Sequence, residues 1–121
     1  MRLASVVFVA DSVQLVFDSA RQEDAPTLSY FVLPEVVEGD KTVRSDAPGW
    51  AGALVSLIGR DVTATTEGPG TGLVVTLGDS AIALRPKIDE LAGPEIAMLR
   101  GFGEKAWMVW RAGEEAFEYL Q

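Results

Sequence analysis

The feature that most constrains the fold is the stretch 46–86, in which one helical pattern leads directly into three short strand patterns. Asp46 is suited to cap the start of the helix, and Gly59 is suited to end it. Between them, apolar residues recur with the spacing of a single helix face. They are Trp50, Ala53, Leu54, Leu57 and Ile58. The sequence therefore predicts a helix at about 46–58.

The strand patterns that follow predict a three-stranded antiparallel meander. Val and Thr dominate 61–66, 73–77 is a β-branched run, and 81–84 is a short apolar segment. Residues 67–72 and 78–80 are rich in Gly, Pro, Asp and Ser, which favour tight turns.

The N-terminal part of the chain predicts a second meander over strands at 5–9, 13–17 and 27–33. Segment VQLVFDS (13–19) resembles LVVTLGDS (73–80). A proline closes the third strand of each meander, Pro34 in one and Pro86 in the other. An internal duplication is one interpretation, and chance similarity between short alternating strands is the other.

The remaining segments complete the predicted fold. Gly-Pro-Glu at 93–95 favours a short helix at about 94–100, and alternation predicts a final strand at about 106–111. Residues 36–37 and 42–43 can pair as a small hairpin or belong to a surface loop. The fold class is thus a single α+β domain over 1–121, mostly antiparallel β, with two meanders joined by a helix. One curved sheet, a half-barrel and two packed sheets all remain open.

Composition excludes several kinds of chemistry. The chain has no His and no Cys, so a Ser-His-Asp triad, a thiol nucleophile and a zinc–thiolate site are excluded. The glycine-rich segment 67–72 lacks the Lys-Ser/Thr of a phosphate-binding loop. We therefore assign no catalytic, cofactor-binding or metal-binding residue and favour a protein that is not an enzyme.

The net charge is −8, which disfavours nucleic acids and acidic membranes as partners. No apolar run approaches the roughly 20 residues of a membrane span, and a cytoplasmic location is expected. A basic protein partner is favoured by this charge, although acidity can serve solubility alone. A homodimer through a free sheet edge is also open.

The candidate partner-binding residues lie near the C-terminus. In the predicted final strand Trp107 and Trp110 fall on opposite faces, so one face would be core and the other would carry a large aromatic. Glu114, Glu115 and Glu118 would form an acidic rim beside it on a short helical tail, with Phe117 and Leu120 facing inward. The alternatives are that both tryptophans are core and that the glutamates are a solvated face.

Two functions follow. The first is a non-catalytic acidic interaction module, immunity-like or regulatory, that binds a basic protein. The alternative is a small-ligand-binding protein or a carboxylate-dependent enzyme, with its pocket between the two meanders and at least two acidic residues in it.

Four segments carry a resemblance to known proteins: VQLVFD (13–18), PGWAGALVSLIG (48–59), GPEIA (93–97) and WMVW (107–110). Together they resemble a group of small uncharacterised bacterial proteins, mainly of actinobacterial type. The resemblance implies a bacterial source and supplies no information on catalysis. In size and acidity the chain is also loosely similar to immunity proteins that neutralise toxins.

Overall fold

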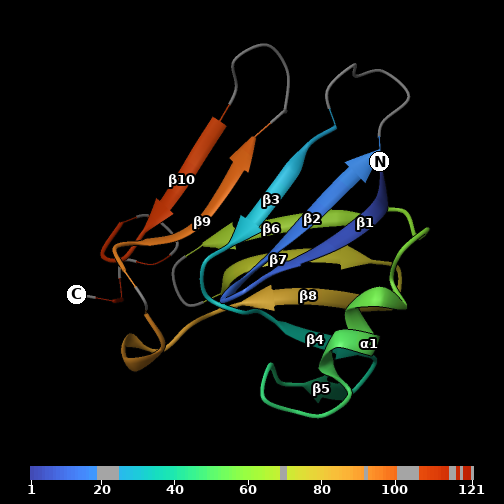
Figure 1. Cartoon of the computed structure of the whole chain (residues 1–121), viewed down its shortest axis with the longest axis horizontal. Helices are drawn as coiled ribbons and strands as arrows, with labels where there is room; N and C mark the ends of the chain where they lie inside the picture. The colour runs from blue at the N-terminus through green and yellow to red at the C-terminus, as the bar shows by residue number, and fades with distance from the viewer. Residues whose placement is uncertain are drawn as a thin grey trace.

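The computed structural model describes residues 1–18, 25–68, 71–91, 93–100, 107–114, 117 and 119–120, and of Trp107 it describes the backbone only. The described residues form a mostly antiparallel β structure with two five-stranded sheets, one short α-helix and one 3-10 turn. Figure 1 shows that the strands of the two sheets run in different directions and cross obliquely.

The first sheet has the strand order β1-β2-β3-β9-β10. Its strands are β1 (Arg2–Val9), β2 (Ser12–Asp18), β3 (Thr27–Tyr30), β9 (Glu95–Arg100) and β10 (Trp107–Arg111). The second sheet has the order β5-β4-β8-β7-β6. Its strands are β4 (Glu35–Glu38), β5 (Lys41–Val43), β6 (Ala64–Gly68), β7 (Gly72–Leu77) and β8 (Ser80–Leu84).

Both sheets have the same plan, which is a meander extended by a hairpin. In the first sheet the meander β1-β2-β3 pairs through β3 with the hairpin β9-β10, and in the second the meander β6-β7-β8 pairs through β8 with the hairpin β4-β5. The chain changes sheet after each meander, near Pro34 and near Pro86, so each meander receives its hairpin from the other half of the chain.

The alternating apolar residues form the core, as the strand patterns predict. Val13, Leu15 and Phe17 of β2 are buried, and so are Ile82 and Leu84 of β8. Of the two alternatives for 36–37 and 42–43, the structure has the hairpin, which is β4-β5. Phe117 and Leu120 are buried, as expected of the C-terminal tail.

The predicted helix at 46–58 is shorter in the structure, where α1 spans Trp50–Val55. Gly49 occupies the N-cap position and supplies no side-chain cap, while Asp46 instead lies 3.8 Å from Arg44 as an ion pair. Turns over 45–49 delay the first helical residue. Gly59, predicted to end the helix, has a φ of +96° and lies in the turn after it.

The predicted helix at 94–100 is wrong, because these residues form strand β9. Six residues are too few to hold a helix without tertiary support, since helix nucleation is costly. β9 pairs with β3 on one side over 97–100 and with β10 on the other side. The 3-10 turn η1 (Ile88–Glu90) precedes it, and the predicted strand at 27–33 ends at Tyr30 before the crossing to the second sheet.

Candidate functional site

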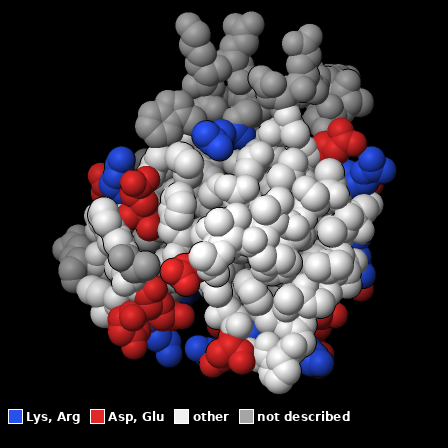
Figure 2. Space-filling view, in the orientation of Figure 1, with Lys and Arg blue, Asp and Glu red and all other residues white. Residues whose placement is uncertain are grey.

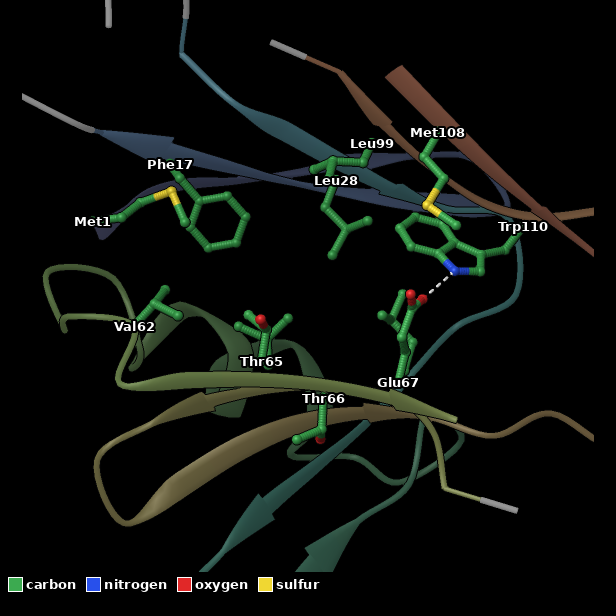
Figure 3. Close-up of a pocket in the computed structure, with 12 residues that line it drawn as sticks. Met1, Phe17, Leu28, Val62, Thr65, Thr66, Glu67, Leu99, Met108 and Trp110 are labelled. Carbon is green, nitrogen blue, oxygen red and sulfur yellow. Dashed lines mark hydrogen bonds between the residues drawn. The ribbon is translucent and has the colours of Figure 1, made fainter. Parts of the chain in front are cut away.

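An apolar cleft of about 310 Å³ lies between the two sheets. Figure 3 shows side chains of the first sheet forming one wall and side chains of β6 forming the opposite wall. The lining residues are Met1, Phe17, Leu28, Val62, Thr65, Thr66, Glu67, Leu73, Val75, Leu99, Met108 and Trp110. This volume is at the lower end of the range of small-molecule pockets.

The register of the first sheet builds the apolar wall. Leu28 pairs with Leu99, and Leu99 pairs with Met108. Paired residues in neighbouring strands point to the same face of a sheet, so these three side chains form one cross-strand row above the cleft. Phe17 extends the wall along β2, two residues beyond Leu15.

Strand β6 brings polar groups to an otherwise apolar site. Thr65 pairs with Val75, and Glu67 pairs with Leu73, so the side chains of Thr65 and Glu67 lie on the inner face of the second sheet. Val75 and Leu73 are both buried. Because β6 is the edge strand, these two polar side chains reach the open side of the cleft instead of the centre of the core.

Trp110 fixes the carboxylate of Glu67. Its Nε1 donates a hydrogen bond of 2.6 Å to Oε2 of Glu67, as the dashed line in Figure 3 shows. Trp110 is only 4% exposed, whereas Glu67 is exposed. The indole therefore holds one carboxylate oxygen of Glu67, and the carboxylate keeps further acceptor capacity.

The other end of the cleft is formed where the chain start meets the segment before β6. The amide N–H of Val62 donates to the carbonyl oxygen of Met1 over 2.7 Å. Both side chains line the cleft, and Figure 3 places them at the end away from Trp110. Among the side chains that line the cleft, Glu67 is the one that carries a charge, and it lies at the end opposite Met1.

The structure distributes the predicted partner-binding residues unevenly. Trp110 is buried in the cleft wall, and Glu114 is exposed in the turn that follows β10. Trp107 pairs with Arg100 through its backbone. Glu115 and Glu118 lie outside the described residues.

Glu67 is the site residue that the sequence did not indicate. It belongs to a Gly-rich segment with the composition of a turn, whereas the structure continues β6 to Gly68. Only strand alternation could have indicated Glu67 as a site residue, because Thr65 and Glu67 share a face of the strand if the strand continues to Glu67.

Two tyrosines outside the cleft have perturbed acidity. Burial raises the pKa of Tyr30, whose hydroxyl has no hydrogen-bond partner within the described residues. Burial also raises the pKa of Tyr119. The positive charge of Arg85 acts to lower this pKa, and the negative charge of Glu90 acts to raise it further. Neither tyrosine lines the cleft.

The described residues contain no group of three or more acidic residues arranged to hold a metal ion. In the same part of the chain, no helix is long and apolar enough to cross a membrane. Comparisons with protein-family models, with curated proteins and with solved structures each found no match.

Proposed function

We propose that this protein binds a small molecule that has an apolar body and a cationic, hydrogen-bond-donating head, in the cleft between its sheets. The observation that carries the proposal is the cleft itself, where apolar walls end at one carboxylate that Trp110 holds in place. Small-molecule sites commonly combine apolar walls with a few placed polar groups.

The head group follows from Glu67 and Trp110. A carboxylate accepts hydrogen bonds and attracts cations, and the face of an indole attracts a cation as well. An acidic chain also repels anionic ligands, since the net charge is −8. An amine or guanidine head therefore suits this end better than a carboxylate or phosphate.

The apolar body of the proposed ligand is inferred from the remaining side chains of the cleft wall. Leu28, Leu99 and Phe17 present hydrocarbon, and Met108 is a flexible side chain that adapts to the shape of a ligand. Glu67 is the one carboxylate among the described lining residues. This favours ligand binding over hydrolysis by a carboxylate pair, which needs a second acidic group.

Thermal unfolding with matched eight-carbon probes tests the proposal. n-Octylamine should raise the melting temperature of the purified chain, n-octanol should raise it less, and n-octanoate least, because stabilisation follows affinity. If neither octylamine nor octanol stabilises the chain, the cleft does not bind such ligands.

Two variant pairs locate the binding. Thr65→Trp should fill the cleft and abolish stabilisation by both octylamine and octanol. Ala64→Trp is the matched control, because Ala64 is the exposed neighbour on the opposite face of β6. Glu67→Gln should remove the preference for the amine, while Glu38→Gln, an exposed residue of β4 that does not line the cleft, should keep it.

The cleft lies between two units of the same plan, and we infer that they arose by duplication. The support is that each meander pairs through its third strand with a hairpin from the other half of the chain. The binding site would then occupy the junction of the two repeats.

A basic protein partner and a cytoplasmic location stay predictions of the sequence. The net charge supports the first, and Glu114, the one residue of the predicted rim that the structure describes, is exposed. Glu114→Lys is therefore a sharper test of that partner than a change at the buried Trp110.

A further inference from the structure

The exposed large hydrophobic side chains of the described residues are concentrated along β1 and α1. Phe8 lies on the inner face of the first sheet, whereas Val7 and Val9 lie on its outer face. Among the described residues, five of the exposed large hydrophobics belong to β1 or to α1 and the turn after it. They are Val7, Phe8, Val9, Val55 and Ile58. We call these five residues the β1–α1 patch.

The two elements of this patch lie next to each other. The ring of Phe8 packs edge-on against Trp50 with 5.9 Å between centroids. Further along, the amide of Gly59 donates to the carbonyl of Leu3 over 2.7 Å. Helix α1 and its final turn therefore follow β1 from near its end back toward its start.

Helix α1 has apolar residues on both sides. Trp50, Ala53 and Leu54 are buried, as the sequence pattern predicts. Val55 and Ile58 are exposed, so Ile58 departs from the predicted buried stripe. A helix that is apolar all round normally buries both sides, and the outward side here has nothing over it within the described chain.

Strand β1 is an edge strand whose outer backbone is only partly paired. The backbone bonds that the described residues make on this side end at Leu3. Natural proteins protect such edges with charged residues or proline. Residues 3–10 (LASVVFVA) contain neither, although the strand has a register shift between Leu3 and Ser5.

We propose that the β1–α1 patch binds a second copy of this chain, with β1 pairing antiparallel to its counterpart across a two-fold axis. The charge distribution selects this occupant. Residues 3–10 and 48–59 carry no charge in a chain whose net charge is −8, and Figure 2 shows few charged side chains over β1 and α1. A basic partner would find no carboxylate on this strand, whereas a second copy places no like charges opposite each other.

The symmetry of the contact supports the same occupant. A two-fold interface uses one patch on both chains, and an antiparallel strand pair has this symmetry by construction. The exposed side chains of Val55 and Ile58 would extend the contact beyond the strands. The patch is separate from the Glu67 end of the cleft, so the proposal does not depend on ligand binding.

Sedimentation velocity on the purified chain over a concentration series tests the proposal. We expect a monomer–dimer equilibrium that shifts toward dimer as salt rises, because salt screens the repulsion between two acidic chains. A complex with a basic partner would show the opposite salt dependence, because salt weakens the attraction between unlike charges. A monomer at every concentration and salt level would overturn the proposal.

Two lysine substitutions locate the interface. Val9→Lys should weaken the dimer at least tenfold, because it places a desolvated charge in the strand pair. Ile88→Lys is the matched control, since Ile88 is 60% exposed in η1, away from the patch, and should leave the dimer unchanged. Circular dichroism should show both variants folded.

Hydrogen exchange provides a second measurement that does not depend on a variant. Amides within residues 5–9 should exchange more slowly at concentrations where the dimer forms. A dimer that survives Val9→Lys and leaves these amides unprotected would use another surface, which would also overturn the proposal.

Discussion

Trp110 and Glu67 join the two sheets at their edges. Trp110 belongs to β10, the last strand of the first sheet, and Glu67 belongs to β6, the last strand of the second. Their hydrogen bond of 2.6 Å crosses the open side of the cleft. The same contact therefore links the sheets and orients the carboxylate that we assign to ligand binding.

Removing this contact should destabilise the protein. Trp110→Phe loses the hydrogen bond to a charged acceptor, which contributes about 1.5–3 kcal/mol, and loses some packing as well. Glu67→Gln should cost less, about 1 kcal/mol or below, because an amide oxygen can still accept the bond. Urea unfolding measures both changes.

A double-mutant cycle separates the bond from the packing. Trp110→Phe should cost clearly less in a Glu67→Ala background than in the wild type. Strictly additive costs would show that the bond does not stabilise the fold.

The strands were largely predictable from the sequence because each buries one face. Val13, Leu15 and Phe17 alternate with more exposed residues, and this period of two fixes both the strand and its inward face. Segment 94–100 was not predictable in the same way. Ile96 and Ala97 are adjacent and both buried, so alternation is broken and the local pattern does not distinguish a strand from a helix.

The pairing of each meander with a hairpin from the other half of the chain could not be predicted from the sequence, for a different reason. Pro34 and Pro86 mark the ends of the two meanders, but no local signal states which sheet the next strand joins. That choice depends on contacts between distant parts of the chain, such as Glu35 with Ala83 and Thr27 with Arg100. The contact between Glu67 and Trp110 was missed with it, since Glu67 faces Trp110 only after both sheets are assembled.

Gly72 should tolerate substitution poorly. Its φ is +76°, and a Cβ built there would collide with the carbonyl oxygen of Leu84. Gly72→Ala should cost about 3 kcal/mol, from overpacking together with an unfavourable backbone conformation. Chemical denaturation measures the loss.

Gly78→Ala is the matched control for this prediction. Gly78 also has a positive φ, +71°, but a Cβ there would meet nothing within 4 Å. Its cost should be about 1 kcal/mol, from the backbone alone. Equal losses at the two positions would show that the contact with Leu84 relaxes without cost.

Replacing Ala10 with glycine should stabilise the protein. It is the first residue of the two-residue turn between Val9 and Ser12, and its φ is +42°. Gly78 occupies the same position in the turn between Leu77 and Ser80. Hairpin turns with a positive φ at this position favour Gly, so Ala10→Gly should raise the free energy of unfolding by about 0.5–1 kcal/mol. A lower denaturation midpoint would contradict this.

Tyr30→Phe should stabilise the protein, and the gain should grow in alkali. The Tyr30 hydroxyl is fully buried without a partner in the described residues, so its removal should gain up to about 1 kcal/mol near neutral pH. Burial raises the pKa of Tyr30 above its ordinary value of about 10. Above that pH the unfolded chain loses this proton while the folded chain keeps it, and wild-type stability falls by up to about 1.4 kcal/mol per pH unit.

Unfolding measured from pH 7 to 11 should therefore show a shallower alkaline loss for Tyr30→Phe than for the wild type. Tyr119→Phe is the control at neutral pH, because the Tyr119 hydroxyl donates a 2.8 Å hydrogen bond to the Pro86 carbonyl and its loss should destabilise. If Tyr30→Phe destabilises the chain as much as Tyr119→Phe, the buried hydroxyl makes a contact equivalent to that bond. If Tyr30→Phe leaves the pH dependence of the free energy of unfolding unchanged, Tyr30 has the same pKa in the folded and the unfolded chain.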